Sequence, residues 1–133
     1  MNRFVLDASA LMALFLNQPG VEMVQDLIRA AVAGRIMLLM NVVNWGEVYY
    51  SVWHELGFQK AEDAVATIAK IPVEIISPDQ EMTRLAAGYK VRLKLPYADA
   101  HAAALSKLRD ATLVTTDRNF QRARQELRIR WVR

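Results

Sequence analysis

Short apolar runs alternate with longer segments of helical periodicity along the whole chain. Runs of four to six mostly apolar residues, bounded by polar or turn residues, are typical of buried strands. They lie at residues 3–6, 35–40, 73–76 and 111–116, and a fifth candidate lies at 128–132. Between them, apolar residues recur at helical spacing over 8–16, 21–33, 44–56, 60–70, 78–93 and 96–108.

This alternation predicts the fold class. Strands that are apolar nearly throughout are buried on both faces, which is the usual environment of parallel strands. Their alternation with helices predicts a three-layer α/β/α sandwich with a central, mostly parallel sheet of four to five strands. The 133 residues contain no internal repeat, low-complexity run or linker. We therefore expect residues 1–133 to form a single domain.

Composition narrows the kind of protein. Cysteine is absent, which excludes disulfides and thiolate metal sites and favours a cytoplasmic location. No apolar stretch approaches the roughly 20 residues that span a bilayer, and no secretory signal is recognisable. We therefore expect a soluble protein without membrane association. Its hydrophobic share of 53% is slightly high for such a domain, which suggests one buried interface besides the core.

Charge is distributed unevenly, although the net charge is only +3. Residues 1–83 contain five Lys or Arg and ten Asp or Glu, whereas residues 84–133 contain twelve and four. A basic excess confined to one part of a chain is typical of a surface that binds polyanions. A merely solvated cationic surface explains the same distribution equally well.

Four acidic residues fall where this fold class binds its ligands. Asp7 directly follows the first strand and Asp117 the fourth, so both lie at the carboxyl edge of the predicted sheet. Open α/β folds bind ligands at that edge. Glu47 and Asp99 join them from the first turns of helices, Glu47 three residues after Asn44.

Each acid also has a structural explanation. Asp7 and Asp117 can cap the helices that follow them. Glu47 fits a pattern resembling a capping box with Asn44, and Asp99 can favour the positive end of its helix dipole. Taken singly, capping is the better explanation for each of them.

A hard cation explains the four acids together. Converging carboxylates repel one another and take up protons unless a cation holds them. Small residues flank Asp99 in LPYADAHAAAL, so nothing bulky shields it, and Glu47 lies on the polar stripe of a mostly apolar helix. Oxygen-only ligands select Mg²⁺ or Mn²⁺ over zinc.

Several motifs closely resemble the PIN-domain family. They are FVLDASAL, a Glu early in a mid-chain helix, LPYADAHAAALS and LVTTDRNF, in the family's order over essentially the whole chain. Within the family, the chain resembles the small VapC-type toxins of bacterial toxin–antitoxin pairs. The resemblance places the metal-binding, catalytic acids at Asp7, Glu47, Asp99 and Asp117.

The resemblance also assigns supporting residues. The family's small hydroxyl residue near the first acid falls on Ser9, and its Ser or Thr two positions before the last acid falls on Thr115. Many members have a further acid where this chain has Asn119. His101 shares a helical stripe with apolar residues, and we interpret it as a packing residue.

A function follows from the resemblance. It implies a Mg²⁺-dependent endoribonuclease, with Mn²⁺ as the other candidate ion, that cleaves RNA by attack of an activated water on a phosphodiester. The site chemistry by itself permits DNA equally well. A catalytically weak RNA-binding module of the same fold is the alternative. The resemblance further implies a VapB-like antitoxin as partner and a homodimer.

Two surfaces are expected in addition to this site. The arginines that follow Asp117 predict a rim that binds RNA phosphates. They are Arg118, Arg122 and Arg124, with Arg128 and Arg130 beyond them. The helices at 44–56 and 8–16 are apolar on more than one face. Their surplus predicts a protein interface, unless the helix at 60–70 covers both.

Overall fold

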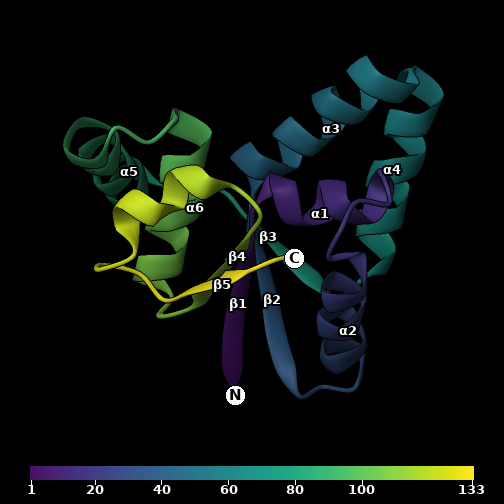
Figure 1. Cartoon of the computed structure of the whole chain (residues 1–133), viewed down its shortest axis with the longest axis horizontal. Helices are drawn as coiled ribbons and strands as arrows, with labels where there is room; N and C mark the ends of the chain where they lie inside the picture. The colour runs from purple at the N-terminus through teal and green to yellow at the C-terminus, as the bar shows by residue number, and fades with distance from the viewer.

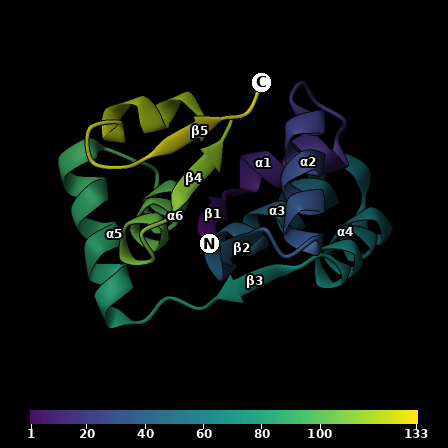
Figure 2. The same cartoon turned by 90° about the horizontal axis from the view of Figure 1, so that it is seen from below.

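Five short strands form one parallel sheet in the computed structural model, which describes residues 1–133. The strands are β1 (Asn2–Leu6), β2 (Ile36–Asn41), β3 (Val73–Ile76), β4 (Thr112–Thr115) and β5 (Ile129–Trp131). Their spatial order is β3-β2-β1-β4-β5, and every neighbouring pair is parallel (Figure 2). The central strand is therefore β1, and the winding reverses between β1 and β4, where open α/β sheets bind ligands.

Helices cover both faces of the sheet (Figure 1). One side carries α1 (Ala8–Phe15), α2 (Val21–Val32), α3 (Val42–Leu56) and α4 (Phe58–Lys70). The other side carries α5 (Gln80–Leu93), α6 (Tyr97–Leu108) and the 3₁₀ helix η1 (Arg118–Ala123). This arrangement confirms the predicted three-layer α/β/α sandwich. None of the helices has the length and apolar content that crossing a membrane requires.

Alternate residues of each strand fill two separate cores. Phe4 and Leu6 of β1 pack with the layer formed by α1 to α4. Val5 faces the opposite layer, together with its register partners Leu39 of β2 and Leu113 of β4. Because successive side chains point to opposite faces and both faces are covered, the strands are continuous apolar runs in the sequence.

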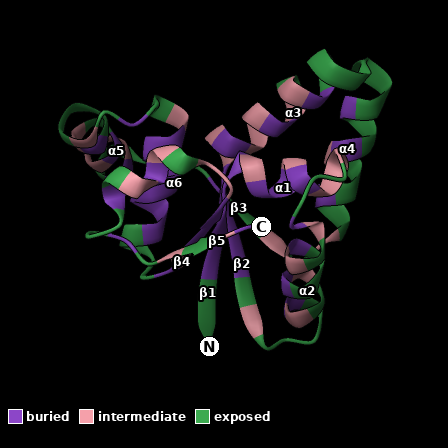
Figure 3. Cartoon of the chain, in the orientation of Figure 1, coloured by how far each residue is buried: buried purple, intermediate pink, exposed green.

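The two ends of the strands differ in burial (Figure 3). The first residues of β1 are exposed and its last three are buried, and β2 shows the same gradient. The carboxyl edge of the sheet is therefore enclosed by the helices that start there, whereas the amino edge is open to solvent.

The start of α3 differs from the sequence prediction. Periodicity predicted a helix over 44–56, but α3 begins at Val42 because Asn41 caps it, with Oδ1 accepting the backbone N–H of Val43 at 3.0 Å. Asn44 therefore lies inside the first turn, and the proposed capping box of Asn44 and Glu47 was wrong.

Candidate metal centre

Asp7 lies between the central strand and α1, at the cap position of the helix. Its Oδ1 accepts the backbone N–H of Ala10 at 3.0 Å, so Asp7 does cap the helix. The residue is only 2% exposed. Burial raises the pKa of Asp7 to about 6 against the opposing effect of its hydrogen bonds, and the charge of Asp117 also raises it. Asp7 therefore caps the helix and, in addition, carries a buried carboxyl group that ionises readily only if a cation is near.

Two hydroxyl groups join Asp7 to the end of β4. Ser9 Oγ donates to Asp7 Oδ1 at 2.7 Å and accepts the backbone N–H of Thr116 at 2.9 Å. Thr115 Oγ1 donates to Asp7 Oδ2 and accepts the backbone N–H of Asp117 at 2.9 Å. These bonds orient the Asp7 carboxylate and hold the loop of Asp117 beside it.

Asp117 also combines capping with proximity to the site. Its Oδ1 accepts the backbone N–H of Asn119 at 2.9 Å and so caps η1. Asn119 therefore contributes its main chain to this loop. Capping and a role in the site are compatible for both Asp7 and Asp117.

Asp99 has no capping role. The cap position of α6 is Pro96, which makes no side-chain cap bond, and Asp99 lies in the first turn of the helix. Asp99 is 7% exposed, and its Oδ2 is buried without a hydrogen-bond partner. The pKa of Asp99 is raised to about 8, first by burial and then by the neighbouring carboxyl groups of Asp117, Asp7 and Glu47. The fold thus brings together the four acids singled out in the sequence.

Glu47 reaches this cluster from α3. Asn44 Nδ2 donates to Glu47 Oε1 at 3.1 Å and to the carbonyl of Ala98 at 3.0 Å. Burial raises the pKa of Glu47, the bond from Asn44 lowers it, and the charge of Asp117 raises it. Sequence reasoning missed Asn44 as a member of the site. Its spacing of three residues from Glu47, which places both on one helix face, was the available signal.

The cluster has no balancing positive charge. None of the ion pairs of the chain involves these four acids. No three His, Cys, Asp or Glu side chains are already arranged to hold an ion. The residues nevertheless fit a hard divalent cation. Asp99 has a buried oxygen without a hydrogen-bond partner, and the raised pKa values of Asp99 and Asp7 show that both carboxyl groups lack a compensating charge. The carboxylate groups also offer only oxygen atoms as metal ligands, which hard cations prefer.

His101 packs against Tyr97, one turn earlier in α6. Its ring meets that of Tyr97 edge-on with 4.6 Å between centroids, and Nδ1 lies 3.0 Å from the Tyr97 carbonyl oxygen. It is 3% exposed, and none of its hydrogen bonds involves the four acids. The side chain therefore behaves as the packing residue that the sequence indicated.

The five arginines predicted as a phosphate rim do not all lie on one surface. Three of them lie exposed on or next to η1: Arg118, Arg122 and Arg124. Arg128 instead precedes β5 and pairs with Asp110, which precedes β4, at 3.0 Å. Since parallel strands all begin at the same edge, this pair lies at the amino edge, opposite the acids. The inclusion of Arg128 in the rim was wrong.

Comparison with known proteins identifies the family. A family model described as PIN domain matches residues 4–126. The chain therefore belongs to the PIN domain family, which confirms the resemblance found in its motifs. No curated protein sequence matches the chain.

Solved structures share the fold at low sequence identity. VapBC2 from Rickettsia felis, bound to a DNA fragment from its promoter, superposes with a TM-score of 0.77 at 16% identity and covers 96% of this chain and 97% of its own. DNA-bound VapBC from Salmonella typhimurium gives 0.75 at 18% identity, with 98% of both chains covered. Mycobacterium tuberculosis VapC20, described as a sarcin-ricin loop cleaving toxin, gives 0.74 at 17%, with 90% and 94% covered.

Proposed function

We propose that this chain is a divalent-metal-dependent endoribonuclease of the VapC type, acting as one PIN domain over residues 1–133. Its cofactor is Mg²⁺ or Mn²⁺, and its substrate is RNA. The environment of Asp99 carries the proposal, because a buried carboxyl group with an unpaired oxygen and three carboxyl neighbours needs a cation in order to ionise. Membership of the PIN domain family, whose VapC-type members are nucleases, supports the same reaction class.

The roles of the side chains follow from their contacts. Asp7, Asp99 and Asp117 would hold the cation, which when bound supplies charge neutralisation at a phosphate oxygen and a more acidic water to attack phosphorus. Ser9 and Thr115 keep the Asp7 carboxylate oriented. Glu47 positions the attacking water or completes the ligand set. Hydrolysis of this kind breaks the bond from phosphorus to O3′ and leaves a 3′-hydroxyl and a 5′-phosphate.

RNA is the proposed substrate on two grounds. One structural relative is described as cleaving the sarcin-ricin loop. The exposed Arg118 also follows Asp117 directly, so a cation suited to phosphates adjoins the acidic cluster. Because the proposed chemistry does not use the 2′-hydroxyl, a DNA of the same sequence is the necessary comparison.

A cleavage assay tests the proposal. Purified protein should cut end-labelled RNA when Mg²⁺ is present and stop when a chelator is added. Asp99→Asn should be inactive, whereas Asp26→Asn, which removes an exposed acid of α2, should cleave like the wild type. RNA that is bound but left intact by the wild type with Mg²⁺ would favour the RNA-binding module instead.

We also propose a VapB-like antitoxin and a homodimer as the assemblies of this chain. Helix α4 covers part of the apolar surplus of α3, since the hydroxyl of Tyr49 donates to Glu62. Four large apolar side chains nevertheless stay about half exposed around the turn between the two helices: Tyr50, Trp53, Leu56 and Phe58. Contiguous exposed apolar residues mark interaction sites, and VapBC complexes are among the structural relatives.

Two measurements test these assemblies. Light scattering should give about twice the 15.1 kDa mass of one chain. Expression of the chain alone should arrest growth, and a cognate small protein should relieve the arrest and bind tightly. A monomeric, harmless protein that still cleaves RNA would contradict the toxin proposal and leave the nuclease proposal standing.

A further inference from the structure

Asn44 is a buried residue whose hydrogen bonds link α3 with the start of α6. It lies in the first turn of α3 and is 0% exposed. Its Nδ2 donates to Oε1 of Glu47 at 3.1 Å and to the backbone carbonyl of Ala98 at 3.0 Å. The side chain therefore connects Glu47 with the start of α6, one residue before Asp99.

The orientation of this carboxamide is set by its neighbours. A carboxylate and a backbone carbonyl only accept hydrogen bonds, so the end of Asn44 that faces Glu47 and Ala98 has to be the nitrogen. Turning the amide over would bring three acceptor oxygens together. Oδ1 consequently occupies the other side, where it is buried and has no donor.

Two unpaired acceptors belong to the same small region. Oδ1 of Asn44 and Oδ2 of Asp99 are the only buried side-chain polar atoms of the chain without a hydrogen-bond partner. Buried acceptors are nearly always paired, so exceptions require an explanation. The two residues are joined through Ala98, and both have Glu47 as a neighbour. Both acceptors are therefore suited to a ligand that brings positive charge and hydrogen-bond donors.

We propose that Asn44 is a positioning residue of this site, whose nitrogen holds Glu47 against the start of α6 and whose oxygen accepts a hydrogen bond from water carried by a hydrated divalent cation. The inference rests on the proposed function, because it requires the cation. Mg²⁺ gives up its waters reluctantly and keeps several of them in carboxylate sites. With such an ion bound, Asp99 would gain a compensating charge and Asn44 Oδ1 a hydrogen-bond donor.

A matched pair of asparagines tests this role. Asn41 is also 0% exposed, and its Nδ2 also donates to a carbonyl of α6, that of His101 at 3.2 Å, but it hydrogen-bonds none of the acids. Asn44→Ala, Asn44→Ser and Asn41→Ala are compared with the wild type. Thermal unfolding at increasing Mn²⁺, without RNA, measures cation binding, and steady-state cleavage separates kcat from KM.

The expected results distinguish positioning from folding. Loss of a residue that orients metal ligands typically costs about 10- to 100-fold in metal affinity or activity. Asn44→Ala should therefore raise the Mn²⁺ concentration for half-maximal stabilisation, and lower kcat, by about that factor, with KM for RNA unchanged. Asn44→Ser should give values between those of the wild type and Asn44→Ala, because its hydroxyl can donate to only one of the two acceptors, Glu47 Oε1 or the Ala98 carbonyl. Asn41→Ala should lower the melting temperature but leave kcat and the Mn²⁺ concentration for half-maximal stabilisation unchanged.

Three results would overturn the proposal. The first is an Asn44 variant that binds Mn²⁺ and turns over RNA like the wild type. The second is an equal effect of Asn41→Ala on both values, or failure of both Asn44 variants to fold, either of which would assign Asn44 to the fold alone. The third is a wild type that neither responds to Mn²⁺ nor cleaves RNA, which would remove the proposed function itself and this role with it.

Discussion

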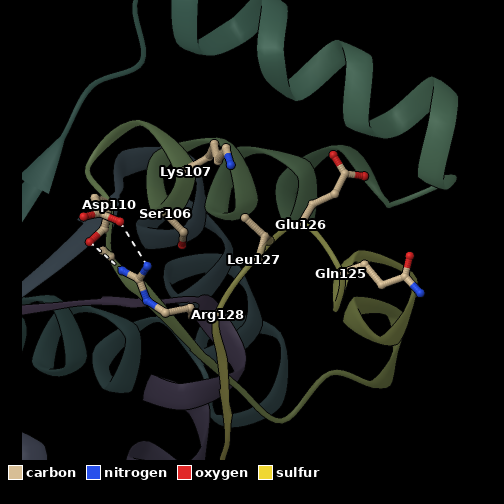
Figure 4. A pocket seen from close by; sticks show the side chains of 8 residues that line it. Ser106, Lys107, Asp110, Gln125, Glu126, Leu127 and Arg128 are labelled. Atoms are coloured by element: carbon tan, nitrogen blue, oxygen red, sulfur yellow. Dashed lines mark hydrogen bonds and ion pairs between the residues drawn. The ribbon is translucent and has the colours of Figure 1, made fainter.

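The two edges of the same sheet use acidic residues in opposite ways. At the carboxyl edge, Asp7 and Asp99 are buried, and burial together with neighbouring carboxyl groups raises their pKa values. At the amino edge, Asp110 is 82% exposed and pairs with Arg128 at 3.0 Å (Figure 4). The fold therefore concentrates carboxyl groups without a partner cation at one edge only, where the strand order reverses. The amino ends of α1 and α3 start at that edge, and their dipoles partly offset the charge.

Buried polar side chains of the amino-edge pocket have partners. This pocket lies between α6 and the segment that leads into β5 (Figure 4). Ser106 Oγ donates to the carbonyl of Ala102 at 2.9 Å, and Arg128 Nη2 donates to the carbonyl of Asp110 at 2.8 Å. No buried acceptor there lacks a donor. A hollow with satisfied polar groups gives no reason to infer a ligand, whereas the acidic cluster does.

The strongest test of this contrast removes one acid from each edge. Asp99→Asn keeps the size of the side chain but removes a charged ligand, so we expect cleavage of RNA to fall by at least about 100-fold. Asp110→Asn removes an exposed ion pair and should leave the cleavage rate unchanged. Rates are measured with saturating Mg²⁺ and RNA. Equal rates for wild type and Asp99→Asn would contradict the assignment of the metal site.

The pH dependence of stability gives a second test. The pKa of Asp99 is about 8 in the folded chain against an ordinary 3.8, so the folded state binds its proton more tightly than the unfolded state. This contribution to stability is complete below about pH 4 and is lost as the pH rises to about 8. Asp7 adds a similar loss between about 4 and 6. Without divalent cations, the melting temperature should therefore fall between pH 5 and 8.

Variants at the two edges serve as controls for this pH effect. Asp99→Asn should flatten the decline and be more stable than the wild type at pH 8 without cations. Asp110→Asn should keep the wild-type slope, because its parent residue is exposed. Adding Mg²⁺ at pH 8 should raise the melting temperature of the wild type more than that of Asp99→Asn. A wild-type slope in Asp99→Asn would show that this carboxyl group is not the cause.

The acids at the carboxyl edge could be predicted from the local sequence around each of them. Asp7 and Asp117 each follow a short apolar run, and the ends of parallel strands meet at one edge, so their convergence needed no knowledge of side-chain contacts. Asp99 was recognisable from its small neighbours. For Asn44 the sequence offered only its spacing from Glu47, because its other contact is with a carbonyl 54 residues away in the chain.

The wrong prediction for Arg128 came from its proximity to Asp117 in the sequence. Arg128 follows Asp117 by only eleven residues, which suggested a common surface. Between them the chain passes through η1 and returns across the sheet to start β5 at the opposite edge. Because β4 and β5 are parallel, the chain has to run back to the amino edge before β5 starts. Residues just before β5 therefore lie far from residues just after β4. Arg118, by contrast, directly follows Asp117 at the start of η1 and so stays at the carboxyl edge.

Packing at the end of β5 provides a third, smaller effect. Gly20 has φ +92°, and a Cβ there would lie 2.5 Å from the side chain of Val132 and 2.7 Å from the nitrogen of Arg133. Gly20→Ala should therefore cost about 1–3 kcal/mol in free energy of unfolding. Gly46→Ala, in α3 with free space around it, should instead stabilise by about 0.5–1 kcal/mol. Urea unfolding measures both changes, and a neutral Gly20→Ala would contradict the close approach.

The smallest expected effect concerns the arginines of the two edges. Arg118 directly follows Asp117, and its guanidinium lies 5.7 Å from the ring of Trp131, which pairs with Thr115 in the sheet. Each phosphate contact with a single strand contributes about −0.7 to the slope of log affinity against log salt. Replacing both Arg118 and Arg122 by Gln in an Asp99→Asn background should therefore flatten the slope by up to about 1.4. Replacing Arg3 and Arg128, at the amino edge, removes the same charge and should leave the slope unchanged. Anisotropy titrations of labelled RNA at several salt concentrations compare the two pairs. If both pairs flatten the slope equally, RNA responds only to net charge, and the two edges do not differ in RNA binding.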